Sequence, residues 1–173
     1  MNKAASDRPW LRPLIGGLVV FAILAGFMSY LFFVSWTDVT DARQVEADRV
    51  FAAAVVEAGG GAPYIEIAAD GTVVVHRDQE SPESRGFETL VLLAWTSADE
   101  KILRLEYPHW FVRLKTSSSF NLGTMISAVR KDWQHLDLSV SYGDLVRRGP
   151  ALLLDHRLEN GSRIMLWTEK DGG

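Results

Sequence analysis

The sequence has no cysteine and only a few histidines, and both shortages limit the chemistry that the chain can perform. Without cysteine, its 173 residues form no disulfide and offer no thiolate as a nucleophile or metal ligand. The four histidines, at positions 76, 109, 135 and 156, form none of the HxH, HxxxH or HExxH pairs that metal sites commonly use. We therefore predict neither a metal site nor a cofactor.

The common catalytic motifs are missing as well. No Gly-x-Ser-x-Gly motif surrounds the serines at 117–119, and the glycine triplet at 59–61 lacks the lysine of a phosphate loop. Asp155 and His156 are neighbours, but adjacent strand residues point to opposite faces, so this aspartate does not orient the histidine as a general base. These observations favour a non-enzymatic protein. A hydrolase that gathers His109 or His156 from distant segments is the less favoured alternative.

Positive charge is also scarce. The chain has 18 lysines and arginines against 22 acidic residues, for a formal net charge of −4. The residues before position 14 carry +2, so the part after position 36 carries about −6 by charge counting. Binding to a phosphate backbone needs a concentrated basic surface. We therefore expect no nucleic-acid partner.

One segment, residues 14–36, contains no charged residue at all. As a helix it would be roughly 34 Å long, enough to cross a hydrocarbon core of about 30 Å. The basic residues before it predict a cytoplasmic N-terminus and a periplasmic C-terminal domain in a bacterial inner membrane. A signal peptide cleaved after Ala42 is the alternative. The predicted organisation is a cytoplasmic tail at 1–13, a transmembrane helix at 14–36, a helical stalk and linker at 37–62, and an extracytoplasmic domain at 63–173.

Small residues recur every four positions within this apolar segment. These pairs are Ala22 with Gly26, and Ala25 with Ser29. Such spacing lets a second membrane helix approach closely. The four residues are our candidates for contact with a transmembrane partner, although small residues are common in membrane helices.

The sequence after the apolar segment predicts an α+β domain. Apolar residues with helical spacing predict a helix over 37–58, which the glycines at 59–61 end. Alternating apolar residues and turn signals predict three antiparallel β-hairpins, over 64–75, 89–105 and 152–167. Helices are predicted over 122–133 and 142–148, whereas 109–115 fits a strand or a helix. The predicted fold class is one N-terminal transmembrane helix followed by antiparallel hairpins packed with one or two helices, which argues against a doubly wound nucleotide-binding fold.

Aromatic and basic residues are mixed in the segment 107–115, and this mixture is typical of protein interfaces. Core packing is the competing explanation for the aromatic residues. The candidate partner-binding residues are Tyr107, His109, Trp110, Phe111, Arg113 and Trp167. We expect an accessory subunit or assembly factor of a membrane protein complex, with membrane proteins and the lipid bilayer as partners and a homo-oligomer as a further possibility. The alternative is a membrane-tethered domain that binds a small ligand or a lipid.

Overall fold

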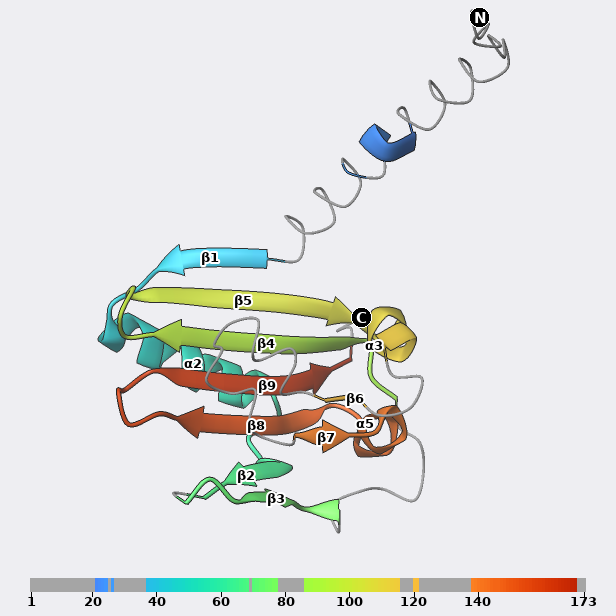
Figure 1. The fold of residues 1–173 in the computed structure, drawn as a ribbon. Coiled ribbons are helices and arrows are strands. Elements are labelled where there is room, and N and C mark those ends of the chain that lie inside the picture. The colour runs from blue at the N-terminus through green and yellow to red at the C-terminus, as the bar shows by residue number, and fades with distance from the viewer. Residues whose placement is uncertain are drawn as a thin grey trace, which may run out of the picture. The chain divides into compact units, whose positions relative to one another are not determined.

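The chain forms two compact units, Met1–Trp36 and Thr37–Gly173. The structure, a computed structural model, describes residues 21–24, 26, 37–68, 70–77, 86–115, 120–121 and 138–170 (Figure 1). The predicted helix at 122–133 lies outside these residues. In the first unit, residues 21–24 and 26 are helical, and Phe21, Ile23 and Leu24 have exposed side chains.

The transmembrane prediction is corrected by the structure. In the described part of the chain, no helix has both the length and the apolar character needed to cross a membrane. The longest described helix, α2 (Gln44–Glu57), has 14 residues and carries both acidic and basic side chains. Its length is about 21 Å, against the roughly 30 Å that a bilayer core requires. A transmembrane helix at 14–36, single-pass anchoring and an inner-membrane location are therefore not supported, although most of 14–36 lies outside the described residues.

A seven-stranded sheet forms the centre of the Thr37–Gly173 unit. Its strands lie in the order β1-β5-β4-β9-β8-β2-β3. Their bounds are β1 (Thr37–Asp41), β2 (Ile65–Ile67), β3 (Val73–Val75), β4 (Thr89–Thr96), β5 (Lys101–Pro108), β8 (Ala151–Arg157) and β9 (Arg163–Glu169). Every pairing is antiparallel except that of β2 with β8. A second, two-stranded sheet pairs β6 (Phe120–Asn121) with β7 (Ser139–Val140). The unit is thus a mixed α+β domain.

The central strand β4 is buried on both faces, which explains its continuous apolar sequence. Its Leu90, Leu92 and Ala94 pack into the core on one face, whereas Val91, Leu93 and Trp95 pack on the other. The alternation follows from the two-residue period of a strand. Helix α2 covers the second face with Ala47, Phe51 and Ala54.

The segment 37–58, predicted as one helix, contains a strand and a helix. Thr37–Asp41 pairs with β5, from Thr37 opposite Leu105 to Asp41 opposite Lys101. Helix α2 begins only at Gln44, and its Glu46 side chain accepts a hydrogen bond from the Arg43 backbone N–H at 3.0 Å. The Trp95 indole Nε1 donates to the Ala42 carbonyl at 2.9 Å and holds the connection against the sheet. This segment is therefore part of the sheet domain.

The three predicted hairpins are confirmed: β2 pairs with β3, β4 with β5, and β8 with β9. In the β8–β9 turn, Gly161 has φ 85°, a conformation that glycine adopts without steric cost. The β8–β9 register shifts between Leu152 and Leu154. This bulge lets Leu152 pack under α2 while Leu153 and Leu154 both join the other core.

Two short helices lie at one end of the sheet (Figure 1). The ambiguous segment forms helix α3 (His109–Lys115), and the predicted helix α5 (Tyr142–Arg148) is confirmed. The Ser141 hydroxyl caps α5 by accepting the Asp144 N–H at 3.1 Å, and the Asp144 carboxylate accepts the Ser141 N–H at 3.1 Å. This reciprocal pair is a capping box.

Candidate functional site

Pro108 positions helix α3 directly after strand β5. The residue pairs with Thr89 as the last residue of β5, and α3 begins at His109. Proline suits this junction because its fixed φ fits the first turn of a helix, where its missing N–H is not needed. The His109 backbone N–H donates to the Glu88 carbonyl at 2.7 Å, and Val112 is buried in the core. These contacts hold α3 against the end of the sheet.

Three aromatic side chains form a cluster around the start of α3. The rings of Tyr107 and Phe111 are stacked, with 5.7 Å between centroids and an interplanar angle of 16°. The rings of Trp110 and Phe111 meet edge to face at 6.0 Å and 86°. Both geometries are favourable for aromatic pairs. The cluster is therefore a packed aromatic surface that is ordered before any partner binds.

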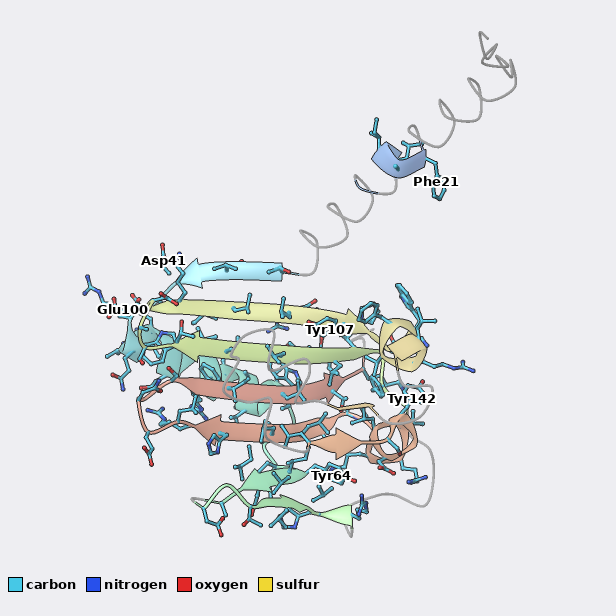
Figure 2. The ribbon with its side chains drawn as sticks, viewed as in Figure 1. Phe21, Asp41, Tyr64, Glu100, Tyr107 and Tyr142 are labelled. Atoms are coloured by element: carbon cyan, nitrogen blue, oxygen red, sulfur yellow. The ribbon has the colours of Figure 1, made fainter. Side chains whose placement is uncertain are left out.

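Much of this cluster faces solvent. Trp110 is 49% exposed and Leu114, one turn further along the helix, is 72% exposed. Tyr107 and Phe111 are half-buried, and burial raises the pKa of the Tyr107 hydroxyl above its usual value of 10. His109 and Arg113 have exposed side chains on the same helix. We call Tyr107, Trp110, Phe111 and Leu114 the α3 surface; Figure 2 shows Tyr107 beside the helix.

Trp167 does not join this surface. It is completely buried on the α2 face of the sheet, next to Met165 and Leu93 in the same core. The Arg104 guanidinium lies 5.3 Å from the centroid of the Trp167 ring. The Trp167 indole Nε1 donates to the Glu169 carboxylate at 3.4 Å. The structure thus brings five of the six candidate partner-binding residues together and places Trp167 in the core.

The candidates in the first unit are only partly described. Ala22 and Gly26 are helical and exposed, whereas Ala25 and Ser29 lie outside the described residues. No neighbouring atom lies within 4 Å of a Cβ built on Gly26. The membrane partner predicted for these four residues rested on the transmembrane helix that the structure does not support.

The described histidines belong to three different parts of the fold. His76 follows β3, His109 begins α3 and His156 lies on β8, while His135 is outside the described residues. Burial lowers the pKa of His156 below its usual 6.5, although the Asp155 charge acts in the opposite direction. In the described ranges, no three His, Asp or Glu residues are arranged to hold a metal ion.

The α2 face holds a group of charged side chains that the sequence did not single out. Arg104 bonds Glu106 at 2.8 Å and Glu57 at 3.4 Å, so it joins β5 to helix α2. Burial raises the pKa of the nearby Glu169 carboxyl, and the hydrogen bond from Trp167 partly offsets this effect. Because Arg104 also lies over the Trp167 ring, we interpret these charged residues as contacts that hold α2 against the sheet.

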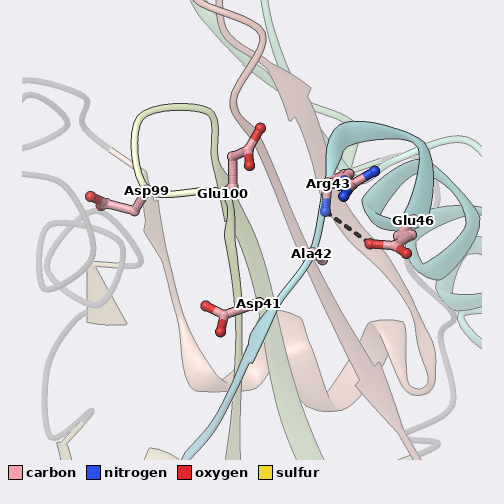
Figure 3. A pocket seen from close by; sticks show the side chains of 6 residues that line it. All are labelled: Asp41, Ala42, Arg43, Glu46, Asp99 and Glu100. Carbon is pink, nitrogen blue, oxygen red and sulfur yellow. Dashed lines mark hydrogen bonds between the residues drawn. The ribbon is translucent and has the colours of Figure 1, made fainter.

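Two open hollows adjoin strand β1 and the start of α2. One, of about 500 Å³, is lined by Asp41, Ala42, Arg43, Glu46, Asp99 and Glu100 (Figure 3). The other, of about 420 Å³, shares Asp41, Ala42 and Glu46 and extends over Leu93 and Ile102. The sequence prediction placed Asp38 and Asp41 in the N-terminal cap of the helix expected at 37–58 and missed this region. The β-branched Thr37, Val39 and Thr40 were the available strand signal.

Comparisons with known proteins add no identification. The chain matches no protein-family model, no curated protein and no solved structure.

Proposed function

We propose that the Thr37–Gly173 unit is a protein-interaction domain, an accessory subunit or assembly factor, that binds a partner protein through the α3 surface. The observation that supports this most directly is the packed aromatic cluster with Trp110 half exposed beside Leu114. Large apolar side chains in contact with water are the groups that gain most from being covered by a partner.

The α3 surface is suited to binding because little order has to be created in it. The Trp110 ring already contacts Phe111, and Phe111 is stacked on Tyr107. A ring held in place loses less side-chain entropy on association than a mobile side chain does. Covering the exposed part of Trp110 and Leu114 contributes on the order of 2 kcal/mol for each side chain, enough to make them the main anchors of an interface.

The polar side chains around the surface indicate the chemistry of the partner, and Arg113 supplies positive charge there. His109 and Arg113 are exposed on the same short helix. A partner segment with an apolar residue for the Trp110–Leu114 surface and carboxylates around it is complementary to this arrangement. The proposed partner is therefore an acidic, apolar-containing segment of another protein.

The test is affinity purification of the full-length tagged chain and two matched double variants. In the first, Trp110→Ala is combined with Leu114→Ser. In the control, Val56→Ser is combined with Val74→Ser; these valines are 78% and 43% exposed and lie on α2 and β3. We expect the wild-type chain and the control to retain a stoichiometric partner and the α3 variant to lose it by at least roughly tenfold, the effect of a hot spot.

Circular dichroism must show that both variants are folded. Equal recovery of the partner with both variants would exclude the α3 surface as the binding site. Recovery of the wild-type chain without any stoichiometric protein would contradict the proposed function itself.

A further inference from the structure

We propose a second interaction surface, independent of α3, at the β1 edge of the sheet: an extended partner segment with alternating basic and apolar residues adds to β1 as a further strand. This surface and the α3 surface use different parts of β5, because β1 pairs with residues 101–105 whereas α3 follows Pro108. The two surfaces can therefore be tested separately.

The first observation is that β1 is a terminal strand with a solvent-exposed backbone edge. It is the last strand in the sheet order, and β5 is its neighbour. Asp38, Val39, Thr40 and Asp41 are all exposed. The N–H and C=O groups along such an edge can pair with an added strand. β1 has five residues, which is long enough to form several main-chain hydrogen bonds.

The second observation is that the two faces of β1 have different chemistry. Asp38 and Thr40 are opposite Arg104 and Ile102, so their side chains are on the face that α2 covers. Val39, which is 55% exposed, is opposite Leu103 and lies on the other face, which has Asp41 at its far end, opposite Lys101. A strand added beside β1 presents alternate side chains to these two faces. The arrangement fits basic residues beside Asp38 and apolar residues beside Val39.

The third observation is the acidic lining of the hollows next to β1. Together they are lined by five carboxylates, those of Asp38, Asp41, Glu46, Asp99 and Glu100, and by two guanidinium groups, those of Arg43 and Arg104. Arg104 is engaged by Glu57 and Glu106. The second hollow, which Asp38, Asp41 and Glu46 line, also has an apolar lining from Leu93, Ile102 and Val50. A lysine or arginine stem can lie on this apolar lining with its charge among those three carboxylates.

These charges favour a basic partner over a second copy of the chain. Two β1 strands paired antiparallel around Val39 would bring Asp38 and Asp41 of both copies into one short ribbon. In that register each Asp38 is opposite Thr40 of the other copy and diagonal to its Asp38, so the two like charges are neighbours and weaken the pairing. The same aspartates protect the edge against indiscriminate strand pairing, so the strand that β1 accepts must supply positive charge.

The test measures fluorescence anisotropy of the full-length chain with labelled synthetic peptides. The probe is KVKVKVK; the first control, KKVVKKV, has the same composition without the alternation, and the second, EVEVEVE, has the opposite charge. We expect KVKVKVK to bind at least roughly tenfold more tightly than KKVVKKV, EVEVEVE not to bind, and added salt to weaken the interaction.

Variants of the chain locate the binding site. Asp38→Lys and Val39→Lys should each weaken KVKVKVK binding by at least roughly tenfold. The control Glu66→Lys, an exposed position on β2 near the opposite edge of the sheet, should leave it unchanged. Trp110→Ala should also leave it unchanged, which separates this proposal from the α3 proposal. Circular dichroism checks that each variant is folded.

Methylated peptides test strand addition itself. In an added strand, alternate residues direct their N–H groups toward β1. N-methyl groups on all lysines or on all valines should therefore have unequal effects, one set abolishing binding and the other preserving it. Equal affinity of KVKVKVK and KKVVKKV, equal effects of the two methylated sets, or no binding would overturn the proposal. So would a peptide-independent dimer that Val39→Lys abolishes, because the occupant of the edge would then be a second copy.

Discussion

Trp95 and Trp110 have the same side chain in opposite situations. Trp95 is buried and donates its indole N–H to the Ala42 carbonyl, whereas Trp110 keeps half of its surface in solvent. A buried indole needs a hydrogen-bond partner, and Trp95 satisfies that need by holding the start of α2 on the sheet. At the scale of single residues, the environment therefore decides whether an aromatic ring serves the core or a surface.

His156 should make the stability of the domain depend on pH. Burial lowers its pKa in the folded chain below the usual 6.5, so the unfolded chain binds the proton more tightly. Stability should therefore fall as the pH drops below about 6.5. In thermal unfolding followed by circular dichroism, wild type should lose more stability than His156→Gln between about pH 7.5 and about pH 5.5. Parallel losses in the two proteins would contradict this assignment.

At the scale of elements, helix α5 shows how a short helix is fixed at its start. It has only 7 residues, too few to be stable without capping and packing. The capping box between Ser141 and Asp144 satisfies its first N–H groups, Arg147 forms an ion pair with Asp144, and Leu145 is buried. The cap, the core residue Leu145, and Tyr142 and Val146 packed against the same core therefore hold the helix in place.

Removing the cap of α5 should destabilise the domain. We expect Ser141→Ala to lower the free energy of unfolding by about 1 kcal/mol, because the Asp144 N–H loses its side-chain acceptor and keeps only the Ser141 carbonyl. Ser141→Thr keeps a hydroxyl at the same position and should retain most of the stability. Urea unfolding curves measure both. A Ser141→Ala variant as stable as wild type would show that the capping box contributes nothing.

Elements with local signals were predictable, and those decided by distant contacts were not. The Asp70-Gly71 and Asn160-Gly161 turns and the β4 sequence identify the hairpins without tertiary information. The strand β1 exists because β5 pairs with it, and nothing in TDVTD excluded a helix cap. The sequence of residues 109–115 fits both the period of a strand and that of a helix. The segment forms a helix, and Val112 is buried in the core.

The candidate site was predictable in part for the same reason. Mixed aromatic and basic composition identified the segment around Trp110, which is local information. Trp167 lies near the end of the sequence without other aromatic residues around it, and only the packing of α2 over its strand shows that it belongs to the core. Likewise, the acidic surface beside β1 combines residues from β1, α2 and the β4–β5 turn, which no sequence window contains.

At the scale of the whole molecule, the Thr37–Gly173 unit has hydrophobic cores of its own. Both cores are formed by residues of the Thr37–Gly173 unit. We therefore expect a chain beginning at Thr37 to unfold cooperatively, with a thermal midpoint within about 3 °C of that of the full chain. Calorimetry on the two proteins is the measurement. A shortened chain without a cooperative transition would show that the first 36 residues contribute to the fold.

The strand order also has a consequence for synthesis. The last two strands to leave the ribosome, β8 and β9, are not at the margin of the sheet but between β4 and β2. While β8 and β9 are still in the exit tunnel, the β2–β3 and β4–β5 hairpins have emerged but lack the two strands that lie between them. The apolar edge of β4 is then uncovered. Until β8 and β9 have emerged, such a nascent chain exposes apolar strand edges that favour aggregation. The sheet of this unit can therefore be completed only after its last two strands, and not its early hairpins, have left the exit tunnel.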